Sequence, residues 1–182
     1  MDQTPLLRTN RFAWLVSAVL LAFTGLIGYR CYRYPPQITT IYIVRHAERQ
    51  DSSSNSPLSP AGHARANTLT HVLKDEGIAA IFVTNLQRTQ QTAAPLAAAT
   101  GLTPIEYPAT VPQTAVDEVL ANHTGGRILI VGHSDTVDDI AAGLGAGGLT
   151  DLAGTQFDRL FVVHRVANVA HLDRLRYGTE TP

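Results

Sequence analysis

Two histidines in this sequence each follow a run of apolar residues. In "IYIVRHAER", residues 41–49, the apolar run leads into Arg45 and His46, and in "ILIVGHSD", residues 128–135, a similar run leads to His133. An imidazole has an unperturbed pKa of about 6.5, so it can act as a nucleophile or exchange a proton near neutral pH. Two such groups at the ends of two strands predict a reactive site.

Arginines accompany these histidines. Arg45 directly precedes the first histidine, and Arg88 in "VTNLQRTQQTAAPL" follows a third apolar run and falls in the first turn of a predicted helix. Two guanidinium forks together with a helix N-terminus bind tetrahedral oxyanions, phosphate above all. Nearby arginines also favour the neutral, nucleophilic form of an imidazole and stabilise the charge of a phosphoryl group during its transfer. The residues therefore predict phosphoryl chemistry, with no need for a metal or other cofactor.

The elements that carry these residues alternate between strand and helix patterns. Ser59 followed by Pro60 is typical of a helix start, and the turn Gly125-Gly126 separates a helix from a strand. Pro95 falls inside a predicted helix, where we expect a kink or a weak point. We predict strands over 38–44, 78–84, 102–107, 127–131, 157–166 and 168–178, and helices over 60–77, 86–99, 111–123 and 135–144.

This order predicts an α/β fold of three layers, a mostly parallel sheet with helices on both faces. In such sheets, ligands bind beyond the carboxyl ends of strands, where the strand order reverses. Both histidines occupy such positions. If their strands are neighbours, the two imidazoles share one crevice.

The motifs resemble those of the histidine phosphatase (phosphoglycerate mutase-like) superfamily, in its small bacterial branch. The resemblance covers residues 41–145 and rests on "VRHAE", "PLSPAGHARA", "TNLQRTQQTA" and "VGHSD", which occur in the family's order. It implies that His46 is a nucleophile that becomes a phosphohistidine. It also implies that Arg45, Arg88 and His133 hold the phosphoryl oxygens. The fold that it implies agrees with the one predicted from the alternation of elements.

The proton donor for the leaving group is not evident from the motifs. Many family members place a glutamate after the second strand–helix unit, but "EYPATVPQTAVDEV" contains no recognisable motif. Glu48 lies near His46 in the sequence, and Asp135 follows His133 by two residues. We expect the general acid to be Glu48 or Asp135, ahead of Asp117 or Glu118.

A phosphomonoester hydrolase is the leading hypothesis for function. A mutase is disfavoured because the domain predicted over 38–182 lacks room for the insertions that enclose substrate in larger family members. Two alternatives remain open: a phosphate-binding or adaptor module with weak or no catalysis, and a phosphatase of phosphohistidine proteins. Substrate identity and oligomeric state are not predicted.

The N-terminal region differs from the rest of the chain. A basic segment, 1–11, precedes an uncharged run over 12–29, which as a helix would be about 27 Å long, close to the thickness of a bilayer core. A stiff linker, 30–37, follows it. We predict a single-pass membrane anchor with an extracytoplasmic, periplasmic catalytic domain, and a cleaved signal peptide or a buried helix as alternatives. That placement suggests envelope sugar phosphates among the phosphorylated small molecules as substrates.

Composition narrows the remaining function classes. The chain has 182 residues, a net charge of −1 and a charged fraction of 16%. Without a basic stripe, nucleic acid is a poor candidate for a partner. The single cysteine, Cys31, excludes an intrachain disulfide and a multi-cysteine metal site.

Overall fold

The computed structural model describes residues 11–33 and 37–182. These residues form two units, helix α1 (Arg11–Arg33) and a domain that begins at Gln37. Residues 1–10 of the predicted basic segment and residues 34–36 of the predicted linker lie outside the described residues.

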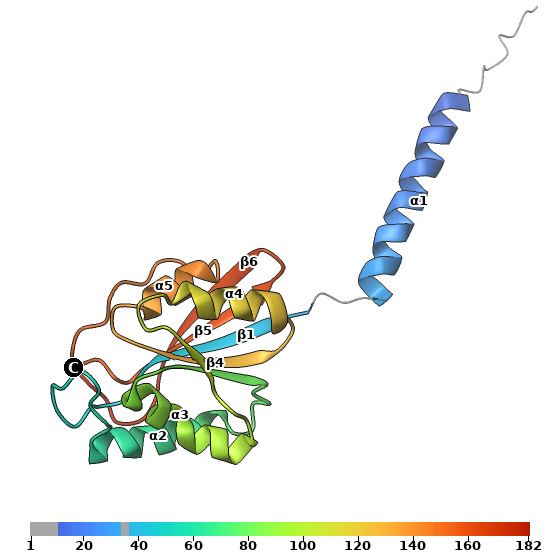
Figure 1. Cartoon of the computed structure of the whole chain (residues 1–182). Helices are drawn as coiled ribbons and strands as arrows, with labels where there is room; N and C mark the ends of the chain where they lie inside the picture. Colours follow the sequence, from blue (N-terminus) through green and yellow to red (C-terminus); the bar gives the residue numbers. More distant parts are fainter. Residues whose placement is uncertain (1–10, 34–36) are drawn as a thin grey trace, which may run out of the picture. The chain divides into compact units, whose positions relative to one another are not determined.

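One mixed sheet forms the centre of the domain (Figure 1). Its six strands lie in the order β3-β2-β4-β1-β5-β6. The first four strands of this order are parallel, and β5 and β6 continue the sheet as an antiparallel hairpin. The strands are β1 (Thr39–Arg45), β2 (Ala80–Thr84), β3 (Ile105–Tyr107), β4 (Arg127–Gly132), β5 (Arg159–Val166) and β6 (Val169–Arg176).

Helices cover both faces of the sheet (Figure 1). Helices α2 (Pro60–Leu73) and α3 (Gln87–Thr100) pack on one face, and α4 (Gln113–Asn122) and α5 (Val137–Gly143) pack on the other. Because successive side chains of a strand point to opposite faces, β1 contributes to both cores and is buried over its whole length. This explains why its central part, Ile41 to Val44, is an apolar run that does not alternate with polar residues.

The three-layer α/β fold expected from the sequence is confirmed, with every predicted strand and helix of the domain present in order. Two details differ. Helix α3 continues through Pro95 to Thr100, and α5 begins at Val137, after the predicted start at Asp135. In α5 the difference arises because residues 134–136 form a turn, in which Thr136 Oγ1 accepts a hydrogen bond from the backbone N–H of His133 at 3.0 Å.

The membrane prediction for the N-terminal region is wrong. Across residues 11–33 and 37–182, no helix combines the length and the apolar character that crossing a bilayer requires. The expected single-pass membrane localisation with an extracytoplasmic domain, and the membrane as a partner of the predicted 12–29 anchor, are therefore corrected.

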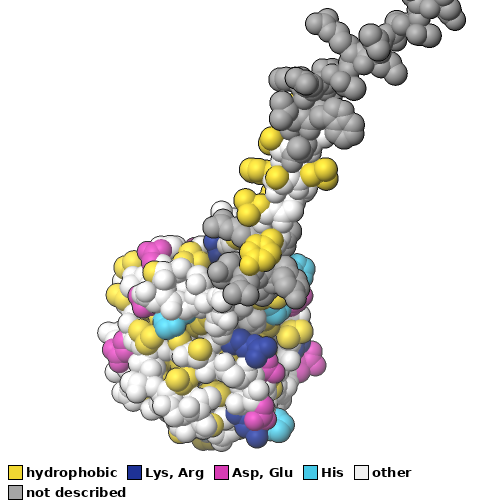
Figure 2. All heavy atoms as spheres, turned by 90° about the vertical axis from the view of Figure 1, so that its right-hand side faces the viewer, with side chains coloured by type: hydrophobic (Ala, Val, Ile, Leu, Met, Phe, Trp, Pro, Cys, Tyr) yellow, Lys and Arg dark blue, Asp and Glu magenta, His cyan; other side chains and the backbone are white. Residues whose placement is uncertain are grey.

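Charged side chains of both signs are interspersed on the face of the domain drawn in Figure 2. No broad field of one sign covers that face, in keeping with the net charge of −1. An excess of positive charge at another place on the domain therefore comes from the residues at that place and not from the charge of the whole chain.

Candidate active site

The carboxyl ends of β1 and β4 form the centre of the site. The two strands are parallel neighbours, with Arg45 beside Gly132 in the register, and the backbone N–H of His46 donates to the carbonyl of Gly132 at 2.9 Å. The chain leaves β1 toward α2 on one face of the sheet and leaves β4 toward α5 on the other. This reversal opens a crevice, and the rings of His46 and His133 lie in it with centroids 5.4 Å apart.

His46 is held as one tautomer. Its side chain is 4% exposed, and Nδ1 lies 2.8 Å from the carbonyl oxygen of Ala47. Because a carbonyl only accepts hydrogen bonds, Nδ1 carries the proton and Nε2 keeps its lone pair. Burial lowers the pKa of His46 to about 3, against the hydrogen bond to Ala47 and with help from the positive charge of Arg45. The imidazole is therefore neutral at physiological pH, as a nucleophile must be.

His133 is the second buried imidazole. Its Nε2 lies 3.2 Å from Oγ1 of Thr84, a hydroxyl that also contacts Thr89 at 2.9 Å. Burial lowers the pKa of His133 to about 4, and the nearby guanidinium of Arg88 adds to this effect. The hydroxyl contacts connect the ends of β2 and β4, so His133 has a fixed position beside His46.

Two arginines complete the floor of the crevice. Arg45 is 7% exposed, and its NH1 donates to the carbonyls of Ala153, Gly154 and Gln156 at 2.9, 3.0 and 3.3 Å. Arg88 at the start of α3 donates from NH1 to the carbonyl of Ser54 at 2.8 Å. The Nε atoms of both arginines are buried and have no acceptor within the described residues. The remaining N–H groups of such arginines suit an anion as acceptor.

These residues line one cavity of about 330 Å³. Three guanidinium groups, those of Arg45, Arg49 and Arg88, face a single carboxylate, that of Asp135. The pKa of Arg45 is lowered to about 10, first by burial and then by repulsion from Arg49 and Arg88. The cavity thus has an excess of positive charge. Its full lining is Arg45, His46, Arg49, Leu86, Arg88, Ala109, Thr110, His133, Ser134 and Asp135.

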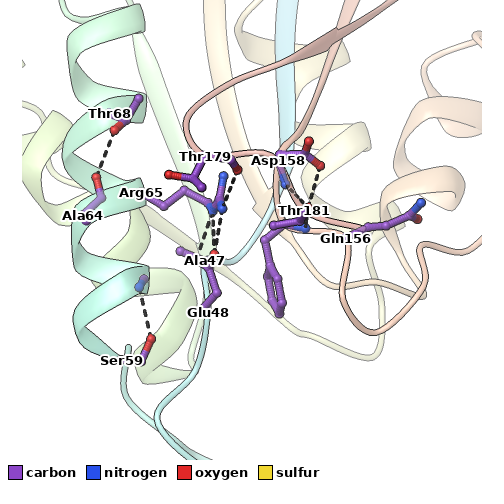
Figure 3. A network of polar contacts seen from close by, with 12 residues as sticks. Ala47, Glu48, Ser59, Ala64, Arg65, Thr68, Gln156, Asp158, Thr179 and Thr181 are labelled. Carbon is purple, nitrogen blue, oxygen red and sulfur yellow. Dashed lines mark hydrogen bonds and ion pairs between the residues drawn. The ribbon is translucent and has the colours of Figure 1, made fainter.

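The structure separates the candidate acids. Asp135 lines the cavity, whereas the carboxylate of Glu48 is bound by Arg65, with Nε–Oε1 and NH2–Oε1 distances of 2.9 and 2.7 Å, and faces another cavity (Figure 3). Asp117 and Glu118 are on α4, where they pair with Gln113 and Asn122. Of the four acids considered from the sequence, Asp135 alone is part of this cavity.

Sequence reasoning missed two residues of the site. Arg49 was visible as the last residue of "RHAER" but was given no role. Phe157 is remote in the sequence and carries no motif, yet its ring lies 4.1 Å from Cζ of Arg45 and 6.2 Å from the ring of His46. A cation over an aromatic face is stabilised electrostatically, so Phe157 helps to fix Arg45.

No group of three or more His, Cys, Asp and Glu side chains suited to a metal ion occurs in the part of the chain that the structure describes. The polar groups of the cavity, three guanidinium groups among them, suit an anion as ligand.

Comparison with protein families gives a match to the histidine phosphatase superfamily (branch 1) over residues 41–110. Among curated proteins, "Probable phosphoglycerate mutase GpmB" of Yersinia pestis (strain Pestoides F) is 37% identical over 75 residues, and its counterpart in Yersinia pseudotuberculosis (serotype O:1b) matches equally. The match covers 37% of this chain and 35% of the relatives, so the chain spans about a third of their length. The resemblance to this superfamily seen in the motifs is confirmed.

Solved structures share the fold. A mycobacterial glucosyl-3-phosphoglycerate phosphatase superposes with a TM-score of 0.61 at 14% identity, covering 78% of this chain and 100% of that chain. The protein histidine phosphatase SixA, in complex with tungstate, superposes with a TM-score of 0.58 at 15% identity, covering 75% and 96%. At these identities the likeness establishes a phosphoglycerate mutase-like fold.

Proposed function

We propose that the domain is a phosphomonoester hydrolase that forms a phosphohistidine on Nε2 of His46. The observation that carries this proposal is the tautomer of His46, because the Nδ1 contact with Ala47 leaves a neutral Nε2 in a cavity with three guanidinium groups. A neutral nucleophile among fixed positive charges is the arrangement that phosphoryl transfer from an ester requires.

The first step forms the covalent intermediate. Arg45 and Arg88 bind the phosphoryl oxygens, and the lone pair on Nε2 of His46 attacks phosphorus while the bond to the ester oxygen breaks. The leaving alcohol takes a proton from Asp135, the carboxyl group that lines the cavity. The fixed guanidinium groups stabilise the charge that spreads over the equatorial oxygens, and His133 binds one of these oxygens.

The second step returns the enzyme to its resting form. Water attacks the phosphorus of phosphohistidine, the phosphorus–nitrogen bond breaks, and inorganic phosphate leaves. The carboxylate of Asp135 accepts the proton of the attacking water, so each turnover ends with the acid recharged. This sequence divides one difficult displacement into two easier ones.

The substrate class that we propose is a phosphorylated small molecule. A cavity of about 330 Å³ holds a phosphoryl group and a small alcohol, and Arg49 at its exposed edge adds a third positive charge. One solved relative carries the name of a glucosyl-3-phosphoglycerate phosphatase. The narrower expectation of an envelope sugar phosphate depended on the extracytoplasmic placement and has lost that basis.

A phosphate-binding module is the second candidate, favoured by one observation. Asp135 is exposed and is the only carboxylate in the lining of the cavity. The cavity therefore has more groups that bind an anion than groups that can donate a proton to a leaving alcohol. Such a module would bind phosphate without hydrolysing esters. A mutase is a third outcome, since the curated relatives are named as phosphoglycerate mutases.

The test uses the full chain with phosphate-labelled p-nitrophenyl phosphate, with and without EDTA. Samples are quenched in alkaline detergent, because the phosphorus–nitrogen bond of phosphohistidine hydrolyses in acid. We expect turnover with EDTA present and a label on the protein that His46→Gln abolishes. Binding of inorganic phosphate without turnover would replace the proposal with the binding module. Isomerisation of 3-phosphoglycerate without release of phosphate would replace it with a mutase.

A further inference from the structure

Glu48 belongs to a buried network behind the candidate site (Figure 3). Its carboxylate accepts from Nε and NH2 of Arg65, which is 5% exposed, in a two-pronged ion pair. The backbone of Glu48 is held as well, because its carbonyl accepts from the N–H of Ser59 at 2.9 Å. Gly62 allows α2 to approach that carbonyl, since a Cβ there would collide with it. The motif "SPAGHARA" therefore fixes the residue two positions after His46.

The same guanidinium binds the segment 177–181, which follows β6 and which we call the strap. Arg65 NH1 and NH2 donate to the carbonyls of Tyr177 and Thr179, each at 3.0 Å. Gly178 between them has φ +70°, and a Cβ on it would lie 3.1 Å from Arg65 NH1. A residue with a side chain is thus strained there in backbone and crowded by the guanidinium. The strap and Arg65 are fitted to one another.

The far end of the strap reaches the residues that support Arg45. Thr181 Oγ1 donates to Oδ1 of Asp158 at 2.7 Å and accepts from the backbone N–H groups of Phe157 and Asp158 at 3.1 and 3.3 Å (Figure 3). Asp158 is 1% exposed, so these contacts are shielded from water. Because the ring of Phe157 lies under Arg45, the hydroxyl of Thr181 fixes a direct neighbour of the phosphate-binding arginine.

We propose that the strap is a positioning device for the reaction, in which Arg65 orients the backbone around His46 and Thr181 orients Phe157 and Arg45. Glu48, Arg65 and Thr181 are then positioning residues, and none of them touches the reacting atoms. The inference rests on the proposed function for its rate measurements. It also makes a prediction about anion affinity that stands without turnover.

The geometry favours this role over a purely structural one. Sheet pairing ends with β6 at Arg176, so the strap adds no strand to the sheet. Its polar contacts go to Arg65, whose partner follows the proposed nucleophile, to the 157–158 pair beside Arg45, and to Arg176 at the end of β6, whose NH1 donates to Oε1 of Glu180 at 2.9 Å. The contacts of Arg65 end two residues after His46, and the contacts of Thr181 end at the residue whose ring lies against Arg45. Small displacements of such groups cost about 10²-fold in rate when they move by about 1 Å.

The experiment uses four variants of the full chain. Thr181→Val removes the hydroxyl and keeps the shape of the side chain, Thr181→Ser keeps the hydroxyl, and Arg65→Lys keeps the charge without the planar fork. Val119→Ala, in the core on the α4 side of the sheet, is the control for loss of stability alone. Each variant is assayed for thermal stability, affinity for inorganic phosphate, and the rate of His46 labelling in a single turnover.

We expect Thr181→Val to weaken phosphate binding and to slow labelling about 10-fold, and Thr181→Ser to restore both. The loss should be the same for phenyl phosphate and p-nitrophenyl phosphate, because a positioning residue transfers no proton. A double-mutant cycle between Arg65→Lys and Thr181→Val should show that their effects on phosphate affinity are coupled, since the strap connects the contacts of Arg65 with those of Thr181. Val119→Ala should lose stability at unchanged phosphate affinity.

Two results would overturn the proposed positioning role of the strap. One is a Thr181→Val variant that loses only thermal stability, as Val119→Ala does. The other is a loss confined to the poor leaving group, which would identify a proton donor. If the wild type binds phosphate but never labels His46, the proposed function fails, and the phosphate affinities of the same variants still decide the role of the strap.

Discussion

Two buried arginines lie on either side of the end of β1, and they differ in what balances their charge. Arg65, 5% exposed, is paired with the carboxylate of Glu48. Burial alone would lower the pKa of Arg65, but the hydrogen bonds and the attraction of Glu48 raise it. Arg45, 7% exposed, contacts three carbonyls and the ring of Phe157, and its pKa is lowered to about 10 by burial and by Arg49 and Arg88.

The difference separates a structural charge from a functional one. An ion pair whose two partners both belong to the protein fixes the backbone and needs no counter-ion from solution. A buried guanidinium surrounded by other cations is costly in the unliganded protein, and a phosphate dianion relieves that cost when it binds. Four experiments test this difference between the side of Arg65 and the side of Arg45.

The largest effect should come from His46, which lies on the functional side. We expect His46→Gln to lose turnover by roughly 10⁴-fold or more, because the other neutral imidazole of the cavity, that of His133, has its Nε2 against Oγ1 of Thr84. Phosphate affinity should change little, since the guanidinium groups remain. Steady-state hydrolysis and phosphate binding measured on the same preparation check this, and retained turnover would refute the covalent mechanism.

Replacing each of the two arginines by methionine tests the comparison directly. Arg65→Met should lower the free energy of unfolding by about 3 kcal/mol, because it leaves the carboxylate of Glu48 half-buried and unpaired. Arg45→Met should lower activity by about 10²- to 10³-fold, as expected for loss of a group that stabilises the transferring phosphoryl.

The stability of Arg45→Met should change by less than about 1 kcal/mol, because two of the three carbonyls that it releases belong to exposed residues, Ala153 and Gly154. Denaturant titrations measure the stability of both variants, and p-nitrophenyl phosphate assays measure their activity. An Arg45→Met variant as unstable as Arg65→Met would remove the distinction.

Asp135 should show an effect that depends on the leaving group. We expect Asp135→Asn to slow hydrolysis of phenyl phosphate by about 10- to 100-fold and that of p-nitrophenyl phosphate by much less, because the better leaving group scarcely needs a proton. Glu48→Gln is the matched control and should affect both substrates equally. The reverse pattern would assign the proton to Glu48.

The smallest effect concerns acid stability. The pKa of His46 is lowered to about 3 in the folded protein, so between about pH 6.5 and pH 3 the unfolded chain binds a proton that the folded chain does not. Stability must therefore fall as pH falls through this window, by up to about 1.4 kcal/mol per pH unit for this one group. His46→Gln should reduce the slope of unfolding free energy against pH by about 1 kcal/mol per unit. An unchanged slope in urea titrations at pH 5 to 7 would contradict the lowered pKa.

The sequence predicted which residues gather at the ends of the strands. Apolar runs identify β1, β2 and β4, and the residues that follow them, Arg45, His46, Arg88 and His133, converge in one cavity. Adjacency of β1 and β4 was a conjecture from the fold class that the register bears out.

What the sequence could not supply are contacts between distant segments that carry no pattern. Phe157 and Thr181 follow no periodic run, and Glu48 and Asp135 stand equally near a histidine in the chain. Their separation depends on side-chain direction at the end of β1, where Arg65 from α2 captures one carboxylate. The anchor predicted over 12–29 relied on the length and the absence of charge in that run, which do not suffice for a helix that crosses a bilayer.

The placement of β4 between β1 and β2 also bears on the synthesis of the protein. His46 is made early, yet its neighbouring strand ends at Gly132, and the ring under Arg45 is that of Phe157. Contacts of such long sequence separation form late and slowly. A nascent chain therefore has His46, the proposed nucleophile, long before the other residues of the candidate site, and these residues come together only when nearly the whole domain has been translated. A truncated chain would carry the "RHAER" motif without the cavity that the other segments complete.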